Sequence, residues 1–433
     1  MGFWSFPILL LMVFLRAPIG LAMLLCGFGG WYMAMGGNPT PLLAKLKSET
    51  YTTFSSYSLS IIPLFLLMGQ FATLSGMSSA LFKAAESFLG HRRGGVAMAA
   101  VGACAGFGAI CGSSLATAAT MSRVALPELR RYGYSGGFST ATLAAGGTLG
   151  ILIPPSVILV IYAILTEQNI AKLFLAAFIP GILAALGYIA TISVYVRLHP
   201  DAAGTRPPVP MGERFRALAD TWPVLVIFFV VVGGIYLGWF TPTEGSAIGA
   251  AGTGLVALMS GSLNWAVLRE SLLGTARTTA MIFFIVLGAA FYNGFLALSG
   301  VPQYMAEWVT TQGYAPLTVL IVILVFYLIF GCLMDSLSMI LLTVPIFFPV
   351  ISAMDFGMSP EHLAIWFGIL VLIVVEVGLI TPPVGMNLFI INSMDRETPI
   401  TDTYKAVMYF VASDIVRVVI LVAFPAITLF LLP

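Results

Sequence analysis

The chain is a succession of apolar stretches, most of them close to the length that an α-helix needs to cross a lipid bilayer, which is about 20 residues. Of its 433 residues, 59% are hydrophobic and only 9% are charged, whereas soluble globular domains carry about 25% charged residues. This pattern predicts an all-α polytopic membrane protein. The net charge of +1 gives no reason to expect a nucleic-acid partner.

Ten stretches are interpreted as membrane spans. The N-terminal stretch is counted among them because it lacks the basic region and cleavage site of a signal peptide. The predicted spans are residues 3–15, 18–36, 59–76, 136–165, 171–196, 222–240, 245–261, 278–298, 362–392 and 406–432. Four amphipathic stretches are expected to lie along the membrane interface. These are residues 45–58, 78–90, 264–277 and 301–312.

Residues 94–123 are too long for a single crossing. As one helix they would extend about 45 Å, against a hydrocarbon core of about 30 Å. Gly112, Ser113 and Ser114 at the middle have poor helix propensity, and arginines flank both ends. A single crossing would put one basic cluster on the wrong side of the membrane. The stretch is therefore predicted to be a re-entrant helical hairpin that opens toward the cytoplasm.

Residues 316–350 have a similar design, with Asp335, Ser336 and Ser338 near the middle. Acidic residues flank this stretch instead of arginines, so the second hairpin is predicted to open toward the periplasm. Counting spans then puts the polar linker 200–220 in the cytoplasm and both termini in the periplasm.

The two halves of the chain share landmarks in the same order. Pro18 matches Pro242, the Ser-Gly pair at 75–76 matches that at 299–300, Pro127 matches Pro349 and Gly150 matches Gly378, at separations of 222 to 228 residues. We therefore expect two repeats, 1–199 and 221–433, each with scaffold spans, a hairpin and a span broken at Pro-Pro (136–165 and 362–392). An odd number of crossings between them would invert the second repeat. Inverted repeats with broken helices are typical of secondary transporters.

The two breaks are the expected ion sites. Proline has no amide hydrogen and disrupts a helix, and glycine loosens it, so carbonyl oxygens are freed that cannot face lipid. Together with tip hydroxyls they suit a hard cation such as Na+. The first predicted sodium site comprises Ser113, Ser114, Thr117, Gly147, Gly150, Ile153, Pro154 and Pro155. The second comprises Asp335, Ser336, Ser338, Gly378, Thr381, Pro382, Pro383 and Val384.

Intramembrane charges are costly and often functional. Asp335 is interpreted as a cation ligand or as a lock for the hairpin tip. Glu376 either serves an ion path or caps the break, and the sequence does not decide between these. Asp414 and Arg417 share a helix face and are expected to form a structural pair. The scattered cysteines and histidines predict no disulfide and no metal site other than Na+.

Six strings distributed over the chain closely resemble one family, the large membrane subunit of tripartite ATP-independent periplasmic (TRAP) transporters. The strings are GSSLATAATM, PELRRYGYS, GTLGILIPPSVILVIYA, GWFTPTEGSAIGA, GCLMDSLSMILLTVP and GLITPPVGMNLF. The resemblance implies a carrier of the bacterial inner membrane that moves a small organic anion by an elevator mechanism with Na+ coupling. It also implies two partners: a small four-helix membrane subunit, and a periplasmic binding protein that delivers the substrate.

The resemblance further implies that the substrate carboxylate lies between the two tips, near Ser113, Ser114, Ser336 and Asn387. The alternative is a one-component carboxylate symporter, coupled to Na+ or H+, which would transport without partners. An enzyme is not expected because no HExxH, GxSxG or carboxylate-dyad pattern occurs. A passive channel is disfavoured because two closed hairpins leave no continuous pore.

Overall fold

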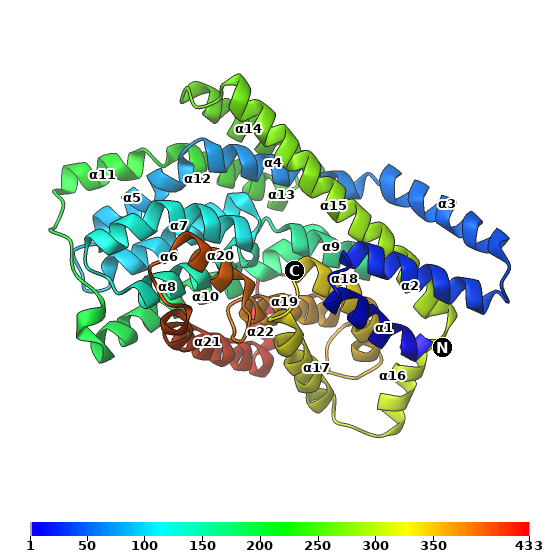
Figure 1. Ribbon diagram of the computed structural model, residues 1–433. Coiled ribbons are helices and arrows are strands. Elements are labelled where there is room, and N and C mark those ends of the chain that lie inside the picture. The colour runs from blue at the N-terminus through cyan, green and yellow to red at the C-terminus, as the bar shows by residue number, and fades with distance from the viewer. Residues whose placement is uncertain (1, 433) are drawn as a thin grey trace.

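The computed structural model describes residues 2–432, and every regular element in that range is helical (Figure 1). The outer ends of the two predicted repeats, Met1 and Pro433, lie outside the described residues. The predicted all-α fold is therefore confirmed.

One group of helices combines segments from both halves of the chain. Helix α2 lies along α15, and α4 packs on α14 and α15. Helix α3 projects from the body beside α2 (Figure 1). The members are α1 (Gly2–Phe14), α2 (Ile19–Ala34), α3 (Pro39–Ser55), η1 (Ser58–Ser60), α4 (Ile61–Leu74), α14 (Pro242–Met259), α15 (Trp265–Leu298) and α16 (Val301–Thr311).

The second group contains both predicted hairpins and both broken spans. From the first half it takes α6 (Gly95–Cys111), α7 (Ser114–Arg131), α8 (Gly136–Leu152), α9 (Val157–Thr166) and α10 (Ile170–Leu198). From the second half it takes α17 (Pro316–Gly331), α18 (Ser336–Ser352), α19 (Pro360–Gly378), α20 (Met386–Met394), α21 (Ile400–Ala423) and α22 (Pro425–Leu429). Contacts between α8 and α21, α7 and α20, and α9 and α18 join the halves.

The segment between the halves is ordered, which the prediction of a plain polar linker at 200–220 missed. It contains η2 (Pro200–Ala202) and α11 (Met211–Ala219). Arg206 binds α5 (Met77–Leu89) through its amide, which donates to the Gly90 carbonyl at 2.9 Å, and through an ion pair with Glu86 at 2.9 Å. The chain continues through α12 (Trp222–Phe228), η3 (Phe229–Gly233) and α13 (Gly234–Tyr236).

Three predicted boundaries are wrong. Residues 264–277 are not a separate interfacial helix but the first part of the continuous α15, because nothing at position 278 interrupts the helix. The second arm of the first hairpin does not end at residue 123 but continues to Arg131. The last predicted span begins at Ile400 and is interrupted between α21 and α22, where Pro425 cannot continue the helical hydrogen bonds.

Length and hydropathy identify four helices that can each cross a membrane, namely α10, α15, α19 and α21. Three bent helix pairs raise the number to seven when each pair is counted as one span. One of these pairs is α8 with α9, bent by 45° at the predicted break. The chain is thus a multi-pass membrane protein, while the count of ten spans and the re-entrant insertion of the hairpins remain predictions.

Candidate ion and substrate site

The first hairpin turns back at Gly112 and Ser113. Gly112 adopts a left-handed conformation (φ +63°), which favours glycine because a side chain would be strained there. Ser113 caps α7 by accepting a hydrogen bond from the Ala116 amide at 3.4 Å. The start of α6 lies near the start of α8, since the Val96 amide donates to the Tyr134 hydroxyl at 3.2 Å. A short turn leads from the end of α7 into α8, so the end of α7 also lies near the start of α6. The two arms of the hairpin, α6 and α7, are therefore antiparallel.

The hairpin tip lies against the break between α8 and α9. A Cβ atom built on Gly112 would be 3.1 Å from the Pro155 carbonyl oxygen. One built on Gly150 would be 2.7 Å from the Ser113 carbonyl oxygen and would also collide with the Thr117 hydroxyl. The contact thus brings together four of the predicted first-site residues, Ser113, Thr117, Gly150 and Pro155.

This break leaves acceptors free. Pro154 and Pro155 have no amide hydrogens, so the carbonyls of Gly150 and Ile151 lose their helical donors. Within residues 2–432, these two oxygens accept no backbone bond from beyond the end of α8. The Thr117 hydroxyl is also buried without a hydrogen-bond partner in that range. Buried polar groups are nearly always paired, so these oxygens fit a bound cation.

The other predicted first-site residues surround this cluster. Ile153 is buried, as are both prolines of the break. Gly147 lies one turn back on α8, where a Cβ atom would be 3.2 Å from the Ser114 carbonyl oxygen. Ser114 is 1% exposed. The break and Thr117 are therefore closed off from the protein surface, while Ser113 at the tip is half-buried.

The second tip is locked by its own aspartate. Asp335 caps α18 by accepting bonds from the Ser338 amide at 3.1 Å and the Ser338 hydroxyl at 2.5 Å. Both carboxylate oxygens are thus occupied within the tip. Of the two roles proposed for Asp335, the geometry favours the lock over the cation ligand.

At the second break, backbone amides of the same segment donate hydrogen bonds to the carbonyls that the prolines leave free. The Gly378 carbonyl accepts from the Thr381 amide at 3.0 Å, and the Leu379 carbonyl accepts from the Asn387 amide at 3.1 Å. A bond from the Gly385 amide to the Cys332 carbonyl at 3.3 Å joins the break to its hairpin. The carbonyls corresponding to the free pair in the first half are therefore occupied.

The second break is also more open than the first. Pro383 is exposed, and Thr381, Pro382 and Val384 are half-buried. The two breaks are thus alike in sequence but differ in hydrogen bonding and in access from the surface.

A shared close approach of backbones positions both hairpins. A Cβ atom on Gly108 of α6 would be 2.5 Å from the Gly150 Cα atom of α8. In the second half, a Cβ atom on Gly378 of α19 would be 2.5 Å from the Gly331 carbonyl carbon of α17. In each half, a glycine on the first arm thus lets the hairpin approach the glycine that precedes Pro-Pro by four residues.

The predicted substrate residues lie on different elements, at the starts of α7 and α18 and in α20. Ser336 donates its hydroxyl to the Glu376 carboxylate, 2.6 Å away on α19. The Asn387 side-chain amide donates to the Ala144 carbonyl of α8 at 3.3 Å, while its Oδ1 atom is buried without a partner in the described range. Asn387 therefore connects the second break to the first half rather than to the tip at Asp335.

Sequence reasoning missed a polar network through the helix packing. The Thr148 and Tyr188 hydroxyls are 2.9 Å apart, and Tyr188 donates to Asp414 at 2.8 Å. Asp414 pairs with Arg417 at 2.8 Å, which confirms the expected pair. Because a buried ion pair needs further hydrogen-bond partners, the Asp414–Arg417 spacing could have prompted a search for a tyrosine such as Tyr188.

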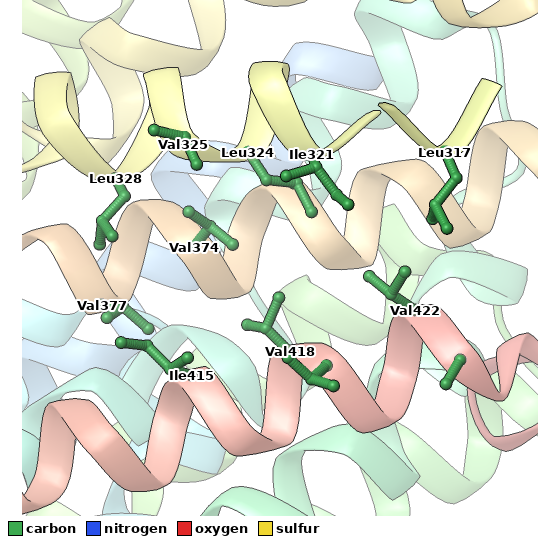
Figure 2. A pocket seen from close by; sticks show the side chains of 12 residues that line it. Leu317, Ile321, Leu324, Val325, Leu328, Val374, Val377, Ile415, Val418 and Val422 are labelled. Carbon is green, nitrogen blue, oxygen red and sulfur yellow. The ribbon is translucent and has the colours of Figure 1, made fainter. Parts of the chain in front are cut away.

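An apolar groove elsewhere on the protein is not suited to an anion. It has a volume of about 570 Å³ and is lined by aliphatic side chains of α17, α19 and α21, such as Leu324, Val374 and Val418 (Figure 2). In the range 2–432, no group of three or more His, Cys, Asp or Glu side chains could hold a metal ion. A cation at the first break would therefore depend on backbone and hydroxyl oxygens.

Comparison with known proteins identifies the family. The family described as "Tripartite ATP-independent periplasmic transporter, DctM component" matches residues 6–427. The C4-dicarboxylate TRAP transporter large permease protein DctM of Pseudomonas aeruginosa is 36% identical over 386 residues, covering 89% of this chain and 88% of that protein. The sialic acid TRAP transporter large permease protein SiaM of Vibrio cholerae is 30% identical over 381 residues, covering 87% and 86%.

A solved structure supports the fold. The YdaH transporter of Alcanivorax borkumensis superposes with a TM-score of 0.60 at 14% sequence identity, covering 89% of each chain. At that identity the likeness concerns the fold alone, whereas the family match covers nearly the whole sequence. The chain belongs to the DctM family, the large membrane components of tripartite ATP-independent periplasmic transporters.

Proposed function

We propose that this chain carries a small organic anion with a carboxylate group across the bacterial inner membrane. The relatives named above are a C4-dicarboxylate and a sialic acid transporter, and both of those substrates are carboxylates. The proposed substrate position lies between the two hairpin tips, where the N-termini of α7 and α18 direct backbone amides and positive dipole ends.

The driving ion is proposed to be Na+. The observation that carries this proposal is the fully buried cluster at the first break, where the Gly150 and Ile151 carbonyls and the Thr117 hydroxyl lack partners within residues 2–432. A second Na+ is proposed near Asp335 and the break at Gly378 to Val384. Several of those oxygens already accept hydrogen bonds within the tip and the break.

An elevator movement is proposed for the transport step. The hairpins and broken spans pack together as one group, and α2, α4, α14 and α15 form another. Movement of the hairpins and broken spans against α2, α4, α14 and α15 would carry the tips across the membrane without unfolding either break. Two partners are proposed from the tripartite character of the family: a small four-helix membrane subunit and a periplasmic binding protein.

Reconstitution of the three proteins in liposomes tests this function. Uptake of a radiolabelled C4-dicarboxylate and of sialic acid would be measured in parallel under an imposed inward Na+ gradient. We expect uptake of at least one of the two that requires both partners and stops when the Na+ gradient is collapsed. Uptake unaffected by that collapse would contradict Na+ coupling. Uptake by this chain alone would favour the one-component symporter.

A further inference from the structure

A polar cavity lies along the second arm of the first hairpin, away from the tip. It has a volume of about 500 Å³ and is lined by the face of α7 that carries Ser122, Leu126 and Arg130, and by the end of α20 at Met394. Ser122 follows Ser114 by eight residues, so the cavity begins about 12 Å from the tip along the helix. It is therefore separate from the proposed substrate position between the two tips.

Both halves of the chain build the walls of this cavity, and ion pairs join them. The Arg130 guanidinium of α7 binds Asp395, which caps α20, and also pairs with Glu397 at 3.1 Å. The other carboxylate oxygen of Asp395 accepts the Thr398 hydroxyl at 2.8 Å. Both oxygens of Asp395 are thus occupied, and the charge of Arg130 is balanced by two carboxylates.

Arg123 lines the same cavity without such a partner. Its side chain is exposed, and it forms no ion pair within residues 2–432. On the same helix, Glu128 pairs with Arg131 at 3.5 Å. Asp395, the acidic residue that lines the cavity, is already bound to Arg130. The charge that Arg123 presents to the cavity is therefore positive and uncompensated.

The Ser122 hydroxyl is a second group without a partner. Ser122 is 0% exposed, and its Oγ atom is buried with no hydrogen bond in the described range. Hydroxyls within helices often donate to a carbonyl three or four residues back, as Ser139 does to Ser135 at 2.9 Å and Thr166 to Tyr162 at 2.8 Å. Because an unpaired buried hydroxyl is unfavourable, a ligand in the cavity with an acceptor oxygen would satisfy it.

These groups match the chemistry of a small organic carboxylate. A guanidinium can bind both oxygens of a carboxylate in parallel, and a cavity of about 300–1,000 Å³ suits a small ligand. Leu126, Pro127 and Met394 offer apolar contact to the carbon body of the ligand, which inorganic phosphate lacks. We propose that this cavity is a second binding site for a small organic carboxylate, held by Arg123 and Ser122. The proposal rests on the proposed function, because it assigns the cavity to the same class of anion.

The position of this site has two consequences. Neither Arg123 nor Ser122 belongs to the proposed sodium sites, so binding in the cavity should not require Na+. Arg123 also lies between the tip of the hairpin and its open end, since α7 runs from Ser114 to Arg131. The site would therefore hold the anion on the side of the membrane toward which the hairpin opens.

Protection of a cysteine reports binding at this cavity alone. Met394→Cys places a thiol in its wall, at a residue that is 37% exposed, while the native cysteines are buried or half-buried. The purified full chain would react with an anionic methanethiosulfonate reagent in Na+-free choline chloride. Labelling of the chain without this substitution would be subtracted. We expect succinate to slow the labelling of Met394→Cys and uncharged succinamide to leave it unchanged.

Two arginine variants of equal charge separate the proposed contact from general electrostatics. In the Met394→Cys chain, Arg123→Gln should raise the succinate concentration for half-protection about tenfold or more, because a hydrogen bond to a charged group is lost. Arg131→Gln removes the same charge from a side chain of α7 that is 69% exposed and does not line the cavity, and should leave that concentration unchanged. Ser122→Ala should raise it without lowering stability, since the hydroxyl has no partner to lose.

Four outcomes would overturn the proposal. They are no protection by succinate, an equal effect of the two arginine variants, protection that appears only when Na+ is added, and protection by inorganic phosphate but not by succinate. The measurements need neither partner proteins nor uptake. The proposed transport function can therefore fail while the site stands, and the site can fail while transport stands.

Discussion

The contact between Gly108 and Gly150 gives the sharpest test of how the first hairpin is positioned. A Cβ atom at position 108 would lie 2.5 Å from the Gly150 Cα atom, 2.9 Å from the Gly150 nitrogen and 3.1 Å from the Leu149 carbonyl oxygen. All three are backbone atoms, so no side chain can rotate away. Gly108→Ala must therefore separate α6 from α8.

The size of the effect follows from this geometry. Carbon atoms make favourable contacts at about 3.5–4.0 Å, whereas the Cβ position at residue 108 is 2.5 Å from the Gly150 Cα atom. The two helices must therefore move apart by about 1 Å or more. Overpacking of this kind typically destabilises by about 1–3 kcal/mol. The movement also displaces the free Gly150 carbonyl from the tip, so Na+ binding should weaken together with stability.

The control lies on the same helix. A Cβ atom on Gly102 would have no atom within 4 Å, and alanine is a better helix former than glycine by about 1 kcal/mol. Gly102→Ala should therefore be neutral or stabilising. The free energy of unfolding would be measured by SDS titration in mixed micelles, and Na+ affinity by binding of radioactive Na+. If Gly108→Ala were as stable as Gly102→Ala, the reasoning from backbone contact would be refuted.

Three further changes probe other contacts. Thr117→Val removes the buried unpaired hydroxyl and should lower Na+ affinity without preventing membrane insertion; an unchanged Na+ titration would move the site elsewhere. Asp395→Asn weakens the ion pair between the 1%-exposed carboxylate and Arg130 of α7 and should cost about 1–3 kcal/mol of unfolding free energy. In a double-mutant cycle with Arg130→Gln, purely additive losses would show that the two side chains are not coupled. Asp414→Asn leaves Arg417 buried without its carboxylate and should cost about 3–5 kcal/mol; a smaller loss in the double variant with Arg417→Gln would confirm coupling, and independent effects would argue against it.

Much of the fold could be predicted because its causes are local. Apolar length predicts the helices, and the paired prolines at 154–155 and 382–383 interrupt them because two successive amide donors are missing. Boundaries were less predictable. The join within α15 at residue 278 was missed because a change from amphipathic to apolar sequence alters the surroundings of a helix but not its hydrogen bonds.

Part of the candidate site could likewise be predicted from the sequence, and part depended on the tertiary structure. The sequence by itself determined that both breaks would leave carbonyls to be satisfied, because proline lacks an amide hydrogen in any context. Only the tertiary structure decided which carbonyls stay free. The Asn387 amide donates to the Leu379 carbonyl in the second half, while no backbone donor among residues 2–432 reaches Ile151 from beyond the first break. That difference depends on where the chain runs after the break.

The same holds for Glu376, whose two roles the sequence left open. Ser336 is distant from it in the chain, and it donates to this carboxyl only because the second hairpin packs against α19. Local chemistry could thus be read from single residues, such as a proline without a donor or a carboxyl in an apolar stretch. The partners of those groups depended on long-range packing, which no periodicity in the sequence encodes.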